Sequence, residues 1–198
     1  MKNIALFASG NGSNAQNIIE YFNLNKENCS TLGGIVKRVI SNRPNSYVLE
    51  RAKMLNVPYS VLSKEELTTS PAPLMRLLED ENIDIIVLAG YLLMIPDELT
   101  KKYNGRIINI HPSLLPAYGG KGMYGNKVHE AVISAGETKS GITIHLVDEI
   151  YDNGKILFQA ECLVMKDDTP DSLAQRIHEL EYIHFPRIID EYVKDALQ

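Results

Sequence analysis

An amide and an imidazole stand two residues apart in a short apolar run, and together they could stabilise a developing negative charge. The run covers residues 107–116 and reads IINIHPSLLP. Side chains alternate along a strand, so Asn109 and His111 point to the same side of it. N–H groups that converge on one point can hydrogen-bond an oxygen that gains negative charge during a reaction. The alternative is a strand end at which both side chains bind only local backbone groups.

The residues around this pair predict a strand that ends at a ligand site. Isoleucines surround Asn109, and β-branched residues favour a buried strand. In open α/β sheets, ligands bind beyond the carboxyl ends of the strands. This run loses its apolar character at His111, after which Pro112 and Pro116 restrict the backbone. We therefore expect a core strand that presents Asn109 and His111 to a ligand.

The same run carries a resemblance to a known family. Residues 109–116 resemble the signature of the folate-dependent formyltransferases, and the chain from Met1 to about Val193 looks like the branch that formylates phosphoribosylglycinamide. The resemblance implies a one-carbon group transferase that moves the formyl group of its co-substrate, 10-formyltetrahydrofolate, to the amine of 5'-phosphoribosylglycinamide in de novo purine biosynthesis. The catalytic residues that it implies are Asn109, His111 and Asp152, with no metal.

Two other activities remain open at this point. One is a folate-dependent formyltransferase that acts on an amino sugar or a nucleotide, and the other is a 10-formyltetrahydrofolate hydrolase. Methionyl-tRNA formyltransferases share the run at 109–116 but add a tRNA-binding domain, and the deformylases add a regulatory domain. The length of 198 residues and the net charge of -5 disfavour a methionyl-tRNA formyltransferase, and the length also disfavours a deformylase with its additional domain.

A glycine-rich loop follows the first predicted strand, residues 2–8, and precedes a predicted helix at 15–23. Residues 9–14 read SGNGSN, and a loop of this kind before a helix can bind an anion through backbone N–H groups. It fits the loose dinucleotide pattern, but no acidic residue ends the second strand at 34–41, which disfavours NAD. A plain tight turn is the alternative. The resemblance implies that the substrate phosphate is held by Gly12, Ser13 and Asn14.

An apolar loop follows the predicted central strand at 84–90. Loops normally face water, so residues 91–95 either pack under a helix or form a flat apolar pocket. The resemblance favours the pocket and implies that the folate is bound by Tyr91, Leu92, Leu93, Met94, Ile95 and Asp148.

The C-terminal third predicts a hairpin and a closing helix. A strand at 140–147 places Thr143 and His145 on one face, and an acidic turn at 148–154 leads into an antiparallel strand at 156–164. Such acids usually only face solvent. The resemblance places the catalytic carboxylate on Asp152 rather than on Asp148.

The closing helix begins at Thr169-Pro170, a typical N-cap followed by proline. We expect Pro186 to kink or break this helix, because proline lacks the backbone N–H. Glu181 is either one more exposed helix acid or, as the resemblance implies, a contact to the glycinamide end of the substrate.

Several positions between these elements carry separate expectations. Relatives imply a cis peptide bond at Leu115-Pro116, a usual device for a tight turn. Residues 119–125 are rich in glycine and predict a lid or a substrate-side loop. The resemblance implies that Lys64 could offer a cation to the substrate phosphate, but we expect a solvated lysine at the helix start that follows Ser63. His129 is either a site residue or a histidine on an ordinary helix face, and we expect the latter.

Composition bounds the fold class and the partners. The chain has 198 residues, of which 44% are hydrophobic, which suits one α/β domain over residues 1–198. We expect a doubly wound, mostly parallel, Rossmann-like sheet with an antiparallel C-terminal hairpin. Residues 1–100 would form the phosphate- and substrate-binding half, and residues 101–198 the catalytic and folate-binding half.

The expected partners are small-molecule substrates, in a monomer or a homodimer. The net charge of -5 argues against nucleic acid, and no apolar run is long enough to span a membrane. Without a recognisable signal peptide, and with Cys29 and Cys162 as the two cysteines, a cytoplasmic location is expected.

Overall fold

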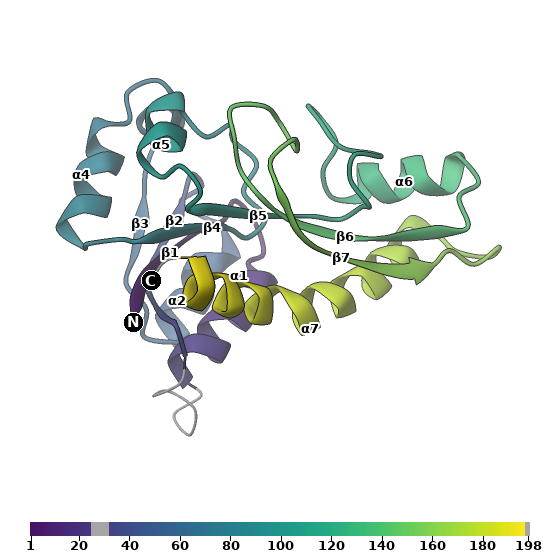
Figure 1. Ribbon diagram of the computed structural model, residues 1–198, viewed down its shortest axis with the longest axis horizontal. Helices are drawn as coiled ribbons and strands as arrows, with labels where there is room; N and C mark the ends of the chain where they lie inside the picture. The colour runs from purple at the N-terminus through teal and green to yellow at the C-terminus, as the bar shows by residue number, and fades with distance from the viewer. Residues whose placement is uncertain (25–31, 197–198) are drawn as a thin grey trace.

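The computed structural model describes residues 1–24 and 32–196, and Cys29 lies outside these residues. Figure 1 shows a central sheet with helices on both faces. In the described residues the sheet has seven strands in the order β3-β2-β1-β4-β5-β6-β7. The strands are β1 (Lys2–Phe7), β2 (Gly34–Ser41), β3 (Tyr59–Val61), β4 (Ile85–Leu88), β5 (Ile107–His111), β6 (Lys139–Leu146) and β7 (Ile156–Leu163). The first five pair in parallel, whereas β5 with β6 and β6 with β7 are antiparallel, which confirms the predicted sheet.

The helices divide between the two faces of the sheet. Apolar residues of α1, η1, α2, α6 and α7 join one core cluster, and those of α3, α4 and α5 join the other. The helices of the first group are α1 (Ser13–Ile19), the π-helical turn η1 (Glu20–Leu24), α2 (Tyr47–Met54), α6 (Asn126–Ser134) and α7 (Pro170–Ala196). Those of the second group are α3 (Lys64–Thr68), α4 (Ala72–Asp80) and α5 (Asp97–Lys102). The doubly wound arrangement is therefore confirmed.

The middle strands are buried on both faces, which explains their continuous apolar sequences. All four residues of β4 are buried. In β1, Ile4 and Leu6 join the α1–α7 cluster, whereas Ala5 and Phe7 join the α3–α5 cluster. Because β1, β4 and β5 run parallel, their carboxyl ends meet at the same edge of the sheet. The glycine loop, the apolar loop and the Asn109–His111 pair follow or end these three strands, so the fold brings them to one place.

Pro186 was predicted to kink or break the last helix, and the break is wrong. Helix α7 runs without a break from Pro170 to Ala196, with Pro186 buried inside it. A proline removes the N–H that would bond the carbonyl four residues earlier, which here belongs to Tyr182. That carbonyl instead accepts a hydrogen bond of 2.9 Å from Asn17 Nδ2 of α1. The neighbouring helix thus satisfies the group that the proline leaves free.

Other local predictions agree with the structure at their main points. Ser63 and Glu66 form the capping box at the start of α3. The Leu115-Pro116 peptide bond is cis. The helix predicted at 15–23 begins at Ser13, and its last turn is π-helical. In the described part of the chain, no helix is long and apolar enough to cross a membrane.

Candidate active site

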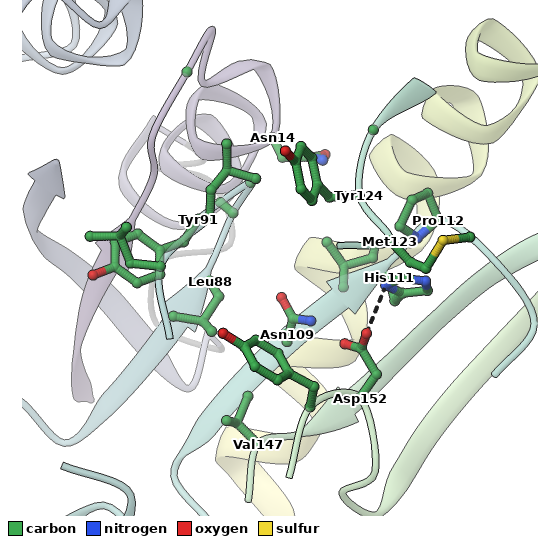
Figure 2. A pocket seen from close by; sticks show the side chains of 18 of the residues that line it. Asn14, Leu88, Tyr91, Asn109, His111, Pro112, Met123, Tyr124, Val147 and Asp152 are labelled. Atoms are coloured by element: carbon green, nitrogen blue, oxygen red, sulfur yellow. Dashed lines mark ion pairs between the residues drawn. The ribbon is translucent and has the colours of Figure 1, made fainter. Parts of the chain in front are cut away.

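A cavity of about 790 Å³ opens at the carboxyl ends of β1, β4 and β5. It is lined by every residue that the sequence analysis assigned to a site, namely Gly12, Ser13, Asn14, Tyr91, Leu92, Leu93, Met94, Ile95, Asn109, His111, Asp148, Asp152 and Glu181. Figure 2 shows Tyr91 on one side of the cavity and His111 with Asp152 on the other, with Asn14 at the top of the view between them. Segments that are far apart in the sequence therefore line the same cavity.

His111 and Asp152 lie next to each other in the wall of this cavity (Figure 2). The distance from His111 Nδ1 to Asp152 Oδ2 is 3.5 Å, and both side chains are largely buried. The other ring nitrogen, Nε2, lies 2.8 Å from the carbonyl oxygen of Tyr118. A carbonyl only accepts, so Nε2 carries a hydrogen and donates it. In the cationic ring the second proton sits on Nδ1, on the side of the carboxylate.

The loop after β5 also holds the carboxylate of Asp152. The backbone N–H of Gly120 donates to Asp152 Oδ2 at 2.8 Å. Asp152 has a φ of 52°, a left-handed conformation that aspartate adopts more readily than most residues. The sequence analysis predicted only a lid or substrate-side loop at 119–125. The structure shows that Tyr118 and Gly120 contact His111 and Asp152 through backbone atoms, which leave no signal in the residue types.

Asn109 is the third polar group at this point, and it lies opposite a buried histidine. Asn109 on β5 pairs directly with His145 on β6. The distance between Asn109 Nδ2 and His145 Nε2 is 3.1 Å. His145 Nδ1 lies 2.8 Å from the carbonyl oxygen of Leu146. Burial lowers the pKa of His145, which favours its neutral form.

The glycine loop lies at the N-terminus of α1, where backbone N–H groups lack partners within the helix. Gly12 has a φ of 77°, and a Cβ there would lie 2.4 Å from the Cβ of Val48. Only glycine therefore fits this loop without strain. The sequence analysis missed Arg51, a cation that lines the same cavity and donates from Nε to the carbonyl oxygen of Asn11 at 2.9 Å. Lys64 is exposed and is not among the lining residues, in keeping with the solvated lysine that we expected.

A polar cluster joins the glycine loop to α7. Glu181 is buried, and its Oε2 accepts from Asn14 Nδ2 and bonds His178 Nδ1, each at 2.8 Å. The bond to Glu181 raises the pKa of His178. Among the described residues Asn14 Oδ1 is buried without a hydrogen-bond partner, so it can accept a hydrogen bond from a ligand. Glu181 is thus not a plain exposed helix acid.

His129 also borders the cavity. It lies in helix α6, but it is buried and lines the cavity rather than facing solvent, so the alternative of a site residue stays open. Its Nδ1 has no hydrogen-bond partner in the part of the chain that the structure describes, and burial lowers the pKa of His129. Helix α6 packs against α7, a contact between distant segments that no local pattern in the sequence reveals.

The loop at 91–95 forms an apolar wall. The side chains of Leu92 and Met94 are each 44% exposed. Tyr91 packs edge-on against Phe7, with ring centroids 5.4 Å apart, and the N–H of Leu92 donates to Ser9 Oγ at 3.1 Å. The wall is therefore anchored at its start and leaves apolar surface free, as a flat aromatic ring system needs.

Asp148 shapes the turn that carries Asp152. Its carboxylate accepts from the N–H of Ile150 at 2.8 Å and from Asn153 Nδ2 at 3.3 Å. Asp148 therefore lines the cavity with its oxygens already engaged. Within residues 1–24 and 32–196, no three histidine, cysteine, aspartate or glutamate side chains are grouped as metal ligands.

Known proteins with similar sequences agree on one family. The model of the family described as formyl transferase matches residues 2–189. The phosphoribosylglycinamide formyltransferase of Bacillus subtilis is 36% identical over 194 residues, which cover 96% of this chain and 94% of that protein. The chloroplastic phosphoribosylglycinamide formyltransferase of Arabidopsis thaliana is 38% identical over 203 residues, which cover 100% of this chain but 67% of the longer plant protein.

A solved structure gives the same result. The crystal structure of the phosphoribosylglycinamide formyltransferase from Streptococcus pneumoniae is 40% identical, with a TM-score of 0.83, and the match covers 96% of this chain and 97% of that one. Sequence and fold thus match over nearly the whole length of two bacterial proteins. The chain therefore belongs to the formyl transferase family and, within it, to the phosphoribosylglycinamide formyltransferases.

Proposed function

We propose that this protein transfers the formyl group of 10-formyltetrahydrofolate to the amine of 5'-phosphoribosylglycinamide in purine biosynthesis. One observation carries the proposal. A single cavity joins the Asn109, His111 and Asp152 set to a glycine loop that suits a phosphate and to an apolar wall that suits a pteridine. The protein acts as one domain on small molecules, as a cytoplasmic monomer or homodimer.

The two substrates approach the catalytic set from opposite sides. The phosphate binds the N–H groups of Gly12, Ser13 and Asn14, with the charge of Arg51 beside them. Glu181 and the free oxygen of Asn14 accept hydrogen bonds from the sugar or glycinamide part. The folate lies against residues 91–95 and beside Asp148. This arrangement places the amine and the formyl carbon between the two binding regions.

The reaction follows from the donors at the centre. The amine attacks the formyl carbon and produces a tetrahedral carbon with an oxyanion. An N–H of Asn109 and the Nδ1–H of cationic His111 stabilise that oxygen. Asp152 stabilises the imidazolium and passes the amine proton, through water, to the leaving nitrogen of the folate. Because the Nε2–H of His111 donates to the carbonyl oxygen of Tyr118, the Nδ1–H is the group that faces Asp152 and the oxyanion.

The first test measures loss of 10-formyltetrahydrofolate with and without 5'-phosphoribosylglycinamide. We expect consumption only when the amine is present, together with one formylated product per folate consumed. Consumption without the amine would mean a hydrolase. This comparison is needed because a formyltetrahydrofolate deformylase from Pseudomonas syringae shares the fold, with a TM-score of 0.83 at 24% identity. An amino sugar and a nucleotide amine serve as further acceptors, and faster transfer to either would contradict the proposed substrate.

The second test separates the two binding regions by hydrogen exchange. A folate analogue without a formyl group should protect the backbone amides of residues 91–95, because it covers the apolar wall. The phosphoribosyl substrate alone should protect residues 10–14 and leave 91–95 unchanged. Equal protection of both segments by either ligand would indicate general tightening of the protein rather than two local sites.

A further inference from the structure

Asn109 is useful to the reaction only when its amide N–H, and not its carbonyl, faces the developing oxyanion. The two orientations of an asparagine amide have nearly the same shape, so packing alone selects weakly between them. A hydrogen-bond partner of fixed polarity must make the choice. In the described residues, the side chain that bonds the Asn109 amide is His145.

The contacts of His145 fix which of its nitrogens accepts. Its Nδ1 lies 2.8 Å from the carbonyl oxygen of Leu146, and because a carbonyl only accepts, Nδ1 carries the hydrogen. The neutral ring then has an unprotonated Nε2, which can only accept. Asn109 must therefore present its NH₂ group to His145, at 3.1 Å. One amide hydrogen binds His145, and the second remains for a ligand in the cavity.

The carbonyl of Leu146, which accepts from His145 Nδ1, is itself held in place. The N–H of Val147, which shares a peptide plane with the Leu146 carbonyl, donates to the carbonyl oxygen of Ile107 at 2.9 Å. Gly154 packs so closely that a Cβ there would lie 1.8 Å from the Leu146 oxygen. A register shift between Ile144 and His145 interrupts the β6–β7 ladder at this point. The irregular hairpin thus aims one carbonyl at the ring of His145.

We propose that His145 is a positioning residue for the transfer reaction, which orients the Asn109 amide through its unprotonated Nε2. Asp152 is not the hydrogen-bond partner of this nitrogen. Its Oδ1 lies 3.7 Å from His145 Nε2, and neither a carboxylate oxygen nor an unprotonated nitrogen can donate a hydrogen bond. The kinetic part of this inference rests on the proposed function. The assigned tautomer of His145 rests on the hydrogen bonds alone.

The kinetic test uses two variants of similar polarity. His145→Gln places an acceptor near the position of Nε2, whereas His145→Asn is too short to reach Asn109. We expect His145→Asn to lower kcat by about 10- to 100-fold, up to the cost of losing one oxyanion donor, with both KM values nearly unchanged. His145→Gln should retain kcat within about threefold of the wild type. Thermal melting and binding of a folate analogue establish that each variant is folded.

A double-mutant comparison separates positioning from general damage. In an Asn109→Ala background, His145→Asn should change kcat by less than about twofold, because the amide that it orients is already gone. The same loss in both backgrounds, or equal losses for His145→Gln and His145→Asn, overturns the inference. A wild-type protein without transferase activity would instead contradict the proposed function.

An independent measurement needs no activity. Nitrogen NMR of the histidine rings in the wild-type protein should show His145 neutral, with hydrogen on Nδ1 and none on Nε2. Hydrogen on Nε2 of the neutral ring would overturn the inference even if the enzyme is active.

Discussion

Replacing Asp152 by asparagine is expected to lower kcat by about 100-fold or more. Asparagine keeps the size of the side chain and an oxygen that can accept from the N–H of Gly120, so the local structure should survive. It removes the negative charge that lies 3.5 Å from His111 Nδ1. The imidazolium then loses its counterion and the amine proton loses its relay. Steady-state rates with both substrates varied provide the measurement.

The affinities should change much less than kcat, because the charge develops only on the way to the tetrahedral state. Asp148→Asn is the matched control, since this carboxylate lines the same cavity but binds Ile150 and Asn153 within its own turn. We expect the control to retain most of its activity. An inactive Asp148→Asn beside a normal Asp152→Asn would place the catalytic carboxylate four residues earlier.

Asp152 and His111 should also behave as one unit. When His111 is replaced by alanine, the further change Asp152→Asn should cost far less than it does in the wild type. Multiplicative losses would mean that the two residues act separately, and the proposed mechanism would then be wrong.

The substitution Gly12→Ala is expected to raise the KM for 5'-phosphoribosylglycinamide by about 10-fold or more, as losing a hydrogen bond to a charged group predicts. Two physical effects act together at this position. A φ of 77° costs a residue with a Cβ about 1–2 kcal/mol, and that Cβ would lie 2.4 Å from Val48. The loop must shift, and its N–H groups then no longer converge on the phosphate.

Gly10→Ala is the matched control in the same loop, because a Cβ at this position would meet no atom of the described residues within 4 Å. It should leave the KM for the phosphoribosyl substrate nearly unchanged. The KM for 10-formyltetrahydrofolate should stay close to the wild-type value in both variants. If Gly12→Ala weakens folate binding as much as substrate binding while the protein remains folded, the loop is not a dedicated phosphate site.

The sequence by itself determined the features that depend only on residues close together in the chain. The apolar run of β4 predicts a strand buried on both faces, and Ser63 with Glu66 predicts the capping box at α3. The run at 109–116 predicts the family and the position of Asn109 and His111 at a strand end. Each of these features depends on neighbouring residues, whose geometry is fixed by backbone periodicity and by bonds within one turn.

Tertiary structure alone decided the features that join distant segments. Asn109 meets His145 across 36 residues because antiparallel pairing sets the register of β5 against β6. Asn14 bonds Glu181 across 167 residues because α1 packs against α7.

The packing of α1 against α7 also explains why the helix continues through Pro186. Local rules predict a kink or a break at this proline, but Asn17 of α1 donates to the carbonyl of Tyr182 that the proline leaves free, and the helix continues. Two backbone contacts at the site could also not be predicted from the sequence. The carbonyl of Tyr118 bonds His111, and the N–H of Gly120 bonds Asp152. Every residue type except proline offers the same carbonyl and N–H, so only the path of the folded chain could place them there.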